Sequence, residues 1–95
     1  MGTFKLSQEA SEDLWRIYQW GVNNHGLERA DQYYNDFFDH FELLAQHPDL
    51  YPEVNDLRQG YRKSLCGVDT VYYRLVGDVV EIMAILRKQD RDQWL

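Results

Sequence analysis

Residues 70–86 read TVYYRLVGDVVEIMAIL, and this stretch decides the fold. Gly77 and Asp78 separate two runs rich in β-branched and aromatic residues, which predicts two antiparallel strands joined by a two-residue turn. Seven of the eight residues from 79 to 86 are apolar, as expected of a strand buried in a small core. This hairpin is therefore the predicted centre of a β-sheet.

The two-residue turn also sets the register of the two strands, so their side chains can be assigned to faces. The predicted pairs are Val76 with Val79, Leu75 with Val80, Arg74 with Glu81, Tyr73 with Ile82, Tyr72 with Met83 and Val71 with Ala84. The face expected to meet the helices carries Val71, Tyr73, Leu75, Val80, Ile82, Ala84 and Leu86. The other face carries Tyr72, Arg74, Val76, Val79, Glu81, Met83, Ile85 and Arg87. Its mixture of apolar and charged side chains is typical of a binding surface.

Two helices are predicted upstream of the hairpin. Residues 4–7 form a short first strand, and Ser7 is placed to cap the helix that follows. The apolar stripe of that helix comprises Ala10, Leu14, Ile17, Tyr18, Gly21 and Val22. The stripe of the second helix, from about residue 27 to 46, comprises Ala30, Tyr34, Phe37, Phe41 and Leu44. The short connection between them predicts a helical hairpin.

A third strand is predicted over residues 60–66, GYRKSLC, after a loop that contains both prolines. We expect Tyr61 and Leu65 to face the core, which would place Arg62 beside Arg74 and Arg87 on the open face; one bulge would reverse this. The predicted fold is α+β in the order β-α-α-β-β-β, with the helical hairpin on one face of a small, mainly antiparallel sheet. Residues 1–95 form a single domain.

The charge distribution argues against a general nucleic-acid binder. Residues 1–56 hold three Lys/Arg against eleven Asp/Glu, a net −8, and residues 57–95 hold seven against five, a net +2. Because an acidic chain is not attracted to polyanions as a whole, a protein partner fits this balance better. The single cysteine, Cys66, excludes an internal disulfide and indicates a reduced, cytoplasmic setting. No segment approaches the ~18 apolar residues of a membrane span.

The basic residues of the final strands have two readings. They are Arg62, Lys63, Arg74, Arg87 and Lys88. They could form a site for an anion or a partner, or they could keep the sheet edges solvated, with Arg74 paired to Glu81 across the strands.

Other chemistry is not indicated by the sequence. His40 and His47 lie two helical turns apart and cannot share one ion directly, so no metal site is predicted. Cys66 has no neighbouring group in the sequence to activate it as a nucleophile. Gly-rich phosphate loops, Cys-pair metal motifs and GxSxG motifs are absent, and no cofactor is predicted.

The whole pattern resembles the ParE toxins of bacterial type II toxin–antitoxin modules, which belong to the RelE/ParE superfamily. The matching segments are SQEASEDLWRIYQW, FELLAQHPDL, LRQGYRK and the YYR…VEIMAILRKQD ending, in the expected order over nearly the whole chain. The resemblance implies a toxin that traps the cleavage complex of DNA gyrase. It also implies a ParD-like antitoxin that wraps the toxin in a hetero-oligomer.

The superfamily also contains RelE- and YoeB-like endoribonucleases, which cut messenger RNA on the ribosome. Such cleavage needs a base, an acid and a cation for the phosphate. YoeB-like nucleases carry His-Tyr near the end of the last strand, where residues 86–90 here read LRKQD. Many ParE sequences have His where Arg87 stands. The resemblance therefore implies a toxin that is not an enzyme, with a RelE-like nuclease or a degenerate partner-binding member as alternatives.

The predicted partner- and target-binding residues combine the open face with the resemblance. They are Arg62, Tyr72, Arg74, Met83, Ile85, Arg87 and Lys88. The resemblance assigns the gyrase contact to residues 83–91, and it implies no catalytic residue and no sequence-specific nucleic-acid binding by the toxin alone. Because the helical half is acidic, we expect an antitoxin with basic residues to cover the helix pair and part of the sheet.

Overall fold

The computed structural model describes residues 2–54 and 58–87. Its elements are β1 (Thr3–Leu6), α1 (Gln8–His25), α2 (Leu27–Gln46), β2 (Arg62–Cys66), β3 (Asp69–Val76) and β4 (Val79–Leu86). The predicted order β-α-α-β-β-β is confirmed, and α2 begins and ends at the predicted residues. Neither helix in these ranges is long and apolar enough to cross a membrane.

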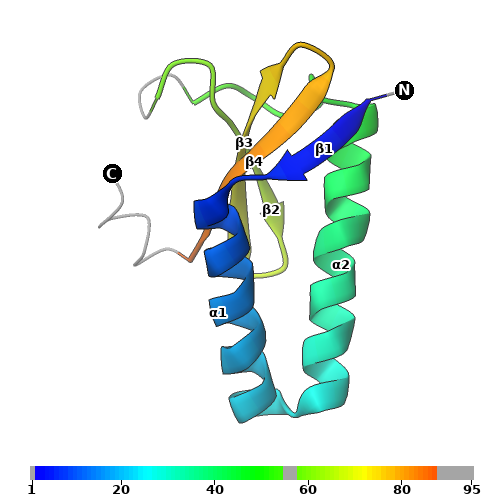
Figure 1. The fold of residues 1–95 in the computed structure, drawn as a ribbon, viewed down its shortest axis with the longest axis vertical. Helices are drawn as coiled ribbons and strands as arrows, with labels where there is room; N and C mark the ends of the chain where they lie inside the picture. The colour runs from blue at the N-terminus through cyan, green and yellow to red at the C-terminus, as the bar shows by residue number, and fades with distance from the viewer. Residues whose placement is uncertain (1, 55–57, 88–95) are drawn as a thin grey trace.

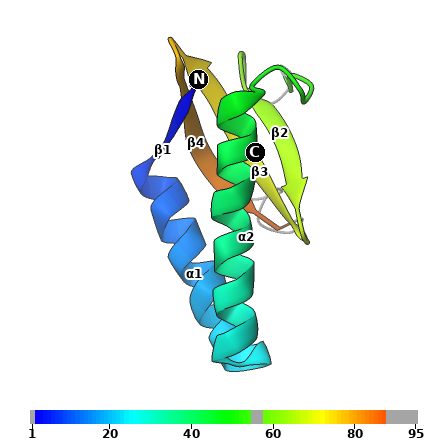
Figure 2. The ribbon, with the colours of Figure 1, turned by 90° about the vertical axis from the view of Figure 1, so that its right-hand side faces the viewer.

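The sheet has the strand order β1-β4-β3-β2. β2 pairs antiparallel with β3, and β3 with β4, whereas β1 runs parallel to β4. Both helices lie on one face of this sheet (Figures 1 and 2). The α+β class is confirmed, with the β3–β4 hairpin as the two central strands.

The main core lies between the helices and the sheet. Phe37 and Phe41 of α2 are fully buried, and the ring of Phe41 lies 5.5 Å from that of Phe4 in β1, measured between centroids. The buried cluster comprises Ala10, Leu14, Ile17, Phe37, Phe41, Leu44, Cys66, Val71, Tyr73, Val80, Ile82 and Ile85. Each predicted stripe therefore contributes to this core, whereas Tyr34 of the second stripe is 37% exposed. Each buried ring removes ~150–250 Å² from water.

The helical hairpin is shaped by its caps and by one close approach. The Ser7 hydroxyl accepts a hydrogen bond from the Ala10 N–H at 3.0 Å, so the predicted N-cap is confirmed. Gly26 joins the helices at φ +91°, a conformation that favours glycine. A Cβ at Gly21 would lie 3.3 Å from the Ala30 Cβ, so a small residue lets the helices pack closely. The connected ends of the helices extend beyond the sheet (Figures 1 and 2).

A β-bulge in β4 interrupts the predicted register. Pairing follows the prediction from the Gly77 turn as far as Tyr73 with Ile82. Tyr72 then pairs with Ala84 instead of Met83, so Met83 is an extra residue in β4. Side chains after the bulge therefore point to the face opposite the predicted one.

The face assignments beyond the bulge were consequently wrong. Ile85, expected on the open face, is fully buried in the main core. Ala84 and Leu86, expected to meet the helices, lie in a separate cluster on the far face. Leu75 lies before the bulge and pairs with Val80 as predicted, but it is 46% exposed because it lies beside the turn.

The bulge is held by the chain segment that begins α1. The Ser7 hydroxyl donates to the Met83 carbonyl at 3.0 Å, and the Ser7 N–H donates to the Ile82 carbonyl at 2.9 Å. The Asp13 carboxylate accepts the Ile85 N–H at 3.0 Å. These contacts satisfy backbone groups that the interrupted ladder leaves unpaired, so α1 and the bulge stabilise each other.

The orientation of β2 was also predicted wrongly. Ser64 and Cys66 are buried on the helix side, whereas Leu65 is 70% exposed on the far face. Arg62 shares the helix side by alternation along the strand. It therefore does not join Arg74 on the open face.

The far face of the sheet is only partly open. Tyr61, Tyr72, Ala84 and Leu86 form a second buried cluster there, with Val54 and Met83 packed against it. The loop reaches this side through the Val54 N–H, which donates to the Tyr61 carbonyl at 2.7 Å. The face expected to be a broad binding surface thus has its own small core.

Candidate functional site

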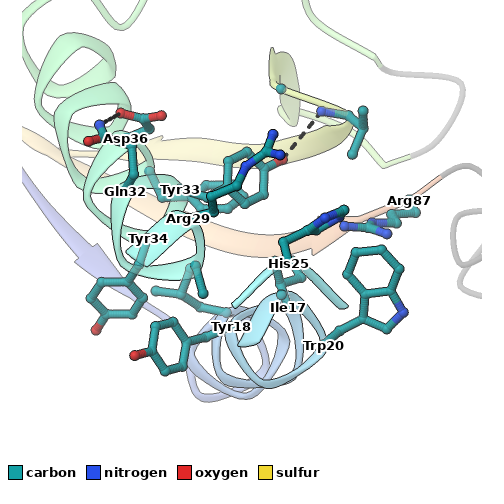
Figure 3. A pocket seen from close by; sticks show the side chains of 16 residues that line it. Ile17, Tyr18, Trp20, His25, Arg29, Gln32, Tyr33, Tyr34, Asp36 and Arg87 are labelled. Atoms are coloured by element: carbon teal, nitrogen blue, oxygen red, sulfur yellow. Dashed lines mark hydrogen bonds between the residues drawn. The ribbon is translucent and has the colours of Figure 1, made fainter. Parts of the chain in front are cut away.

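A groove of about 740 Å³ opens between α1 and α2, close to their connection. Its apolar lining includes Leu14, Ile17 and Phe37 from the helices. The β2–β3 turn contributes Gly67, and Arg87 closes the groove from the end of β4. Figure 3 shows the side chains that line it.

A buried carboxylate fixes Arg87 at the edge of this groove. The Asp69 side chain is fully buried, and its Oδ1 accepts from the Arg87 Nε at 3.0 Å. Its Oδ2 accepts from the Tyr33 hydroxyl at 2.8 Å. Burial, and then the hydrogen bond to Asp69, raise the pKa of Tyr33, which keeps this phenol neutral. Arg87 is thereby attached to both β3 and α2.

Tyr33 also constrains the turn between β2 and β3. Its hydroxyl accepts the Val68 N–H at 3.3 Å (Figure 3). Gly67 has φ +60°, and a Cβ there would lie 2.6 Å from the Tyr33 hydroxyl oxygen. Glycine is therefore required by the backbone conformation and by the contact with Tyr33.

Trp20 of α1 packs on the other side of Arg87. The guanidinium carbon lies 4.4 Å from the centroid of the Trp20 ring, a cation–π contact. The same ring meets His25 edge-on at 5.3 Å. The Arg87 side chain, 27% exposed, is held in one place by Asp69 and Trp20.

The groove has a cationic end and an acidic end. His25 and Arg87 both contact the Trp20 ring at one end, and Arg29 also lines the groove (Figure 3). At the other end, the Gln32 side chain donates to the Asp36 carboxylate at 2.9 Å. The apolar floor separates the two, so the groove is suited to an amphipathic occupant.

The predicted arginines do not share a site. The Arg62 Nη1 donates to the Tyr51 carbonyl at 2.5 Å, and its Nη2 lies 3.4 Å from Glu53 and 3.6 Å from Asp49. Arg62 is level with Tyr73, four residues along β3 from the Asp69 that binds Arg87, or ~14 Å at strand spacing.

Arg74 lies on the far face and forms the predicted pair with Glu81, at 2.6 Å. Tyr72 is 2% exposed and Ile85 is fully buried, so neither presents a side chain to a partner in this conformation. Met83, the bulge residue, is half-buried. Lys88 lies outside the described residues.

The sequence reasoning missed Asp69, Tyr33 and Trp20. The signal for Asp69 was present, since an acidic residue that begins an apolar strand requires a partner. The expected register placed Asp69 opposite Leu86, whereas the bulge brings it level with Arg87.

His40 has a structural partner. Its Nε2 lies 2.7 Å from the Ser64 Oγ, and burial lowers its pKa, so the neutral imidazole is favoured. Within residues 2–54 and 58–87, no group of three or more His, Cys, Asp or Glu side chains could hold a metal ion.

Comparisons with known proteins place this geometry in a family. Residues 4–92 match the family model described as the ParE toxin of the type II toxin–antitoxin system parDE. Toxin ParE1 of Caulobacter vibrioides is 34% identical over 88 residues, which cover 93% of this chain and 91% of that protein. Toxin ParE1 of Mycobacterium tuberculosis is 25% identical over 87 residues, covering 90% and 89%.

A solved structure has the same fold. A chain described as the chromosomal ParDE TA system from P. aeruginosa superposes with a TM-score of 0.79 at 24% identity. The match covers 92% of the present chain and 96% of that chain, so the helical hairpin and the sheet are both shared.

Proposed function

The chain belongs to the ParE toxin family of type II toxin–antitoxin systems, and from this we propose that it inhibits DNA gyrase until a ParD-like antitoxin neutralises it. The observation that carries the proposal is the family match over residues 4–92. The inhibition consists in trapping the gyrase–DNA cleavage complex in the cytoplasm. It requires no catalytic residue in the toxin.

Antitoxin binding is supported by the exposed apolar surface of the helix pair. Trp15, Trp20 and Leu27 are 58%, 45% and 61% exposed, and the groove beside Trp20 has an apolar floor. Exposed aromatic side chains next to a preformed groove are typical of protein interfaces. We assign the groove to a segment of the antitoxin.

The gyrase contact is assigned to residues 83–91, with Arg87 at the centre of this range. Asp69 and Trp20 orient Arg87, and they anchor the start of the C-terminal segment to the domain. The buried Tyr72 and Ile85 are no longer proposed as direct contacts. Arg87 and Lys88 remain the proposed contact residues.

The test variants leave Arg87 unchanged. Arg87→Glu would bring a second carboxylate against the buried Asp69 and would destabilise the fold. Charge reversals are therefore made at Lys88 and Arg91, giving K88E/R91E. Lys63→Glu is the control, because Lys63 is exposed on the far face of β2.

The assay measures gyrase supercoiling and cleaved DNA with the purified toxin. Wild type should inhibit supercoiling and accumulate cleaved DNA at micromolar concentration, and added antitoxin should prevent both. K88E/R91E should be roughly tenfold weaker, since charges at an interface rim mainly change association. Gyrase unaffected by wild type would refute the function; full activity of K88E/R91E would refute only the contact.

Ribosome-dependent RNA cleavage is the competing function. Arg62, Arg74 and Arg87 are each paired with a carboxylate and point to different parts of the molecule. Toeprinting of translating ribosomes with wild type should show no codon-specific cuts. Cuts that disappear in Arg62→Ala would select the nuclease instead.

A further inference from the structure

We propose that the groove between α1 and α2 selects a partner segment that carries a carboxylate, bound between Arg29, His25 and Arg87. The occupant is an amphipathic segment of the antitoxin, so this inference rests on the proposed function. Apolar side chains of the segment pack on the groove floor, and its carboxylate lies at the end near the helix connection.

Arg29 is an exposed cation that lines the groove. It belongs to α2 and makes no ion pair with any described residue. An exposed arginine beside an apolar floor is available for a bidentate contact with a carboxylate. Such a contact would be stronger than a fully solvated one, because the occupant excludes water from the groove.

Arg87 is a second cation that is already in position. Asp69 takes its Nε, and Trp20 packs against its face. The side chain is still 27% exposed and lines the groove, so it can contact an occupant there. Because the side chain is already held, binding an anion costs little further conformational entropy.

The acidic residues of the helical half do not oppose this selection. Among the described acidic residues, Asp36 alone lines the groove, and it lies at the end away from His25. The other described acidic side chains do not line the groove, although Asp69 pairs with Arg87 at its edge. The expectation of a basic partner, drawn from the net charge of −8, therefore does not apply to the groove.

The polarity of the groove favours a peptide over a nucleic acid. A polyanion would bring phosphates against Asp36 as well as onto Arg29, and the whole chain carries a net charge of −6. An amphipathic peptide can place one carboxylate at the cationic end, apolar side chains over Leu14, Ile17 and Phe37, and a donor near Asp36.

The test uses a displayed library of random peptides about 16 residues long, or ~24 Å as a helix, selected on the intact wild-type toxin. Selected peptides should carry Asp or Glu at a fixed spacing from two apolar residues. Arg29→Glu should weaken their binding by roughly tenfold, while Lys63→Glu should leave it within about twofold. Both residues are exposed and both substitutions change the net charge by the same amount, so the two variants should affect folding to the same extent.

Three outcomes would overturn the inference. They are peptides without an acidic preference, peptides that bind Arg29→Glu as tightly as wild type, and a selection that yields no binders. Binding of a fluorescent single-stranded oligonucleotide is measured with the same variants. If the oligonucleotide binds and Arg29→Glu weakens that binding, the occupant of the groove is a nucleic acid and not a peptide. Because this binding assay contains no gyrase, its failure would leave the supercoiling result, and hence the proposed function, unaffected.

Discussion

The two sides of the sheet hold the same kind of ion pair in different surroundings. On the helix side, the Arg87 Nε lies 3.0 Å from an Asp69 side chain that is fully buried. On the far side, the Arg74 Nη2 lies 2.6 Å from Glu81, with the arginine side chain 44% exposed. We expect the shorter contact to contribute less to stability, because water and salt screen its more exposed arginine. The degree of burial should therefore predict the relative strength of these two ion pairs better than the N–O distance does.

The pKa of Glu81 illustrates the far side. The hydrogen bond from Arg74 lowers this pKa, and Lys5, 3.5 Å away, contributes in the same direction. A carboxyl whose pKa is depressed by folding adds stability above its unfolded pKa and loses it as the pH falls through the folded value. Because its partners Arg74 and Lys5 are 44% and 61% exposed, solvent screens both ion pairs and this contribution is small.

The largest effect should come from the core on the helix side. Phe41→Ala should lower the free energy of unfolding by ~3–5 kcal/mol, because the ring is fully buried and its removal leaves a cavity. Urea denaturation measures this. A loss below ~1 kcal/mol would mean that the helix side is not the main source of stability.

The two ion pairs can be compared directly by removing each carboxylate. Asp69→Ala should cost about 2–3 kcal/mol, because it leaves Arg87 without its buried acceptor, while the Tyr33 hydroxyl keeps only the Cys66 carbonyl at 2.9 Å. Glu81→Ala, the matched variant on the far side, should cost under ~1 kcal/mol. Equal losses in thermal or urea unfolding would break the comparison.

The bulge should depend on α1. Asp13→Ala should cost ~1–3 kcal/mol, because the buried Ile85 N–H loses its acceptor. Asp13→Asn keeps a carbonyl oxygen at this place and should cost less. Hydrogen exchange at the Ile85 amide reports the contact directly; unchanged protection in Asp13→Ala would refute its role in holding the bulge.

The orientation of β2 can be tested by thiol labelling, and the substitutions used there should change stability the least. Burial, followed by the nearby Asp36 and Asp69 charges, raises the pKa of the Cys66 thiol to about 11. Native Cys66 should therefore react slowly with a disulfide reagent at pH 8, because the thiolate is the nucleophile. Leu65→Cys in a Cys66→Ala background should react rapidly, since position 65 is 70% exposed.

The raised pKa of the Cys66 thiol also predicts how the stability of the fold depends on pH. The fold favours the protonated thiol, so its contribution is fully present below the ordinary pKa of 9.0 and is lost as the pH rises toward about 11. Fast labelling of native Cys66 at pH 8 would place β2 in the opposite orientation.

Local patterns were sufficient for the elements and the fold class. The Gly77 turn predicted four strand pairs correctly, and the Ser7 cap and the apolar stripes placed both helices. These features depend on neighbours within a few residues, which sequence periodicity records. The resemblance to ParE toxins, quoted from segments along the whole chain, is confirmed by the family match.

The candidate site was predicted only in part. Arg87 was identified from its place at the end of the last strand, but it was assigned to the wrong face. Arg62 was grouped with it and lies elsewhere, because the orientation of β2 depends on a loop and not on the strand's own pattern. Trp20 and Tyr33 come from helices distant in sequence, so no local motif contained them.

The sequence by itself determined the order of the elements, the central hairpin and the side of each helix that is buried, since each follows from turn chemistry and short-range periodicity. Only the tertiary structure decided the bulge at Met83, because the groups that stabilise it, Ser7 and Asp13, lie about seventy residues away in the chain. One inserted residue reversed the end of β4 and brought Arg87 to Asp69. A strand's faces alternate at every residue, so a single long-range contact that sets the register decides which side chains reach the groove.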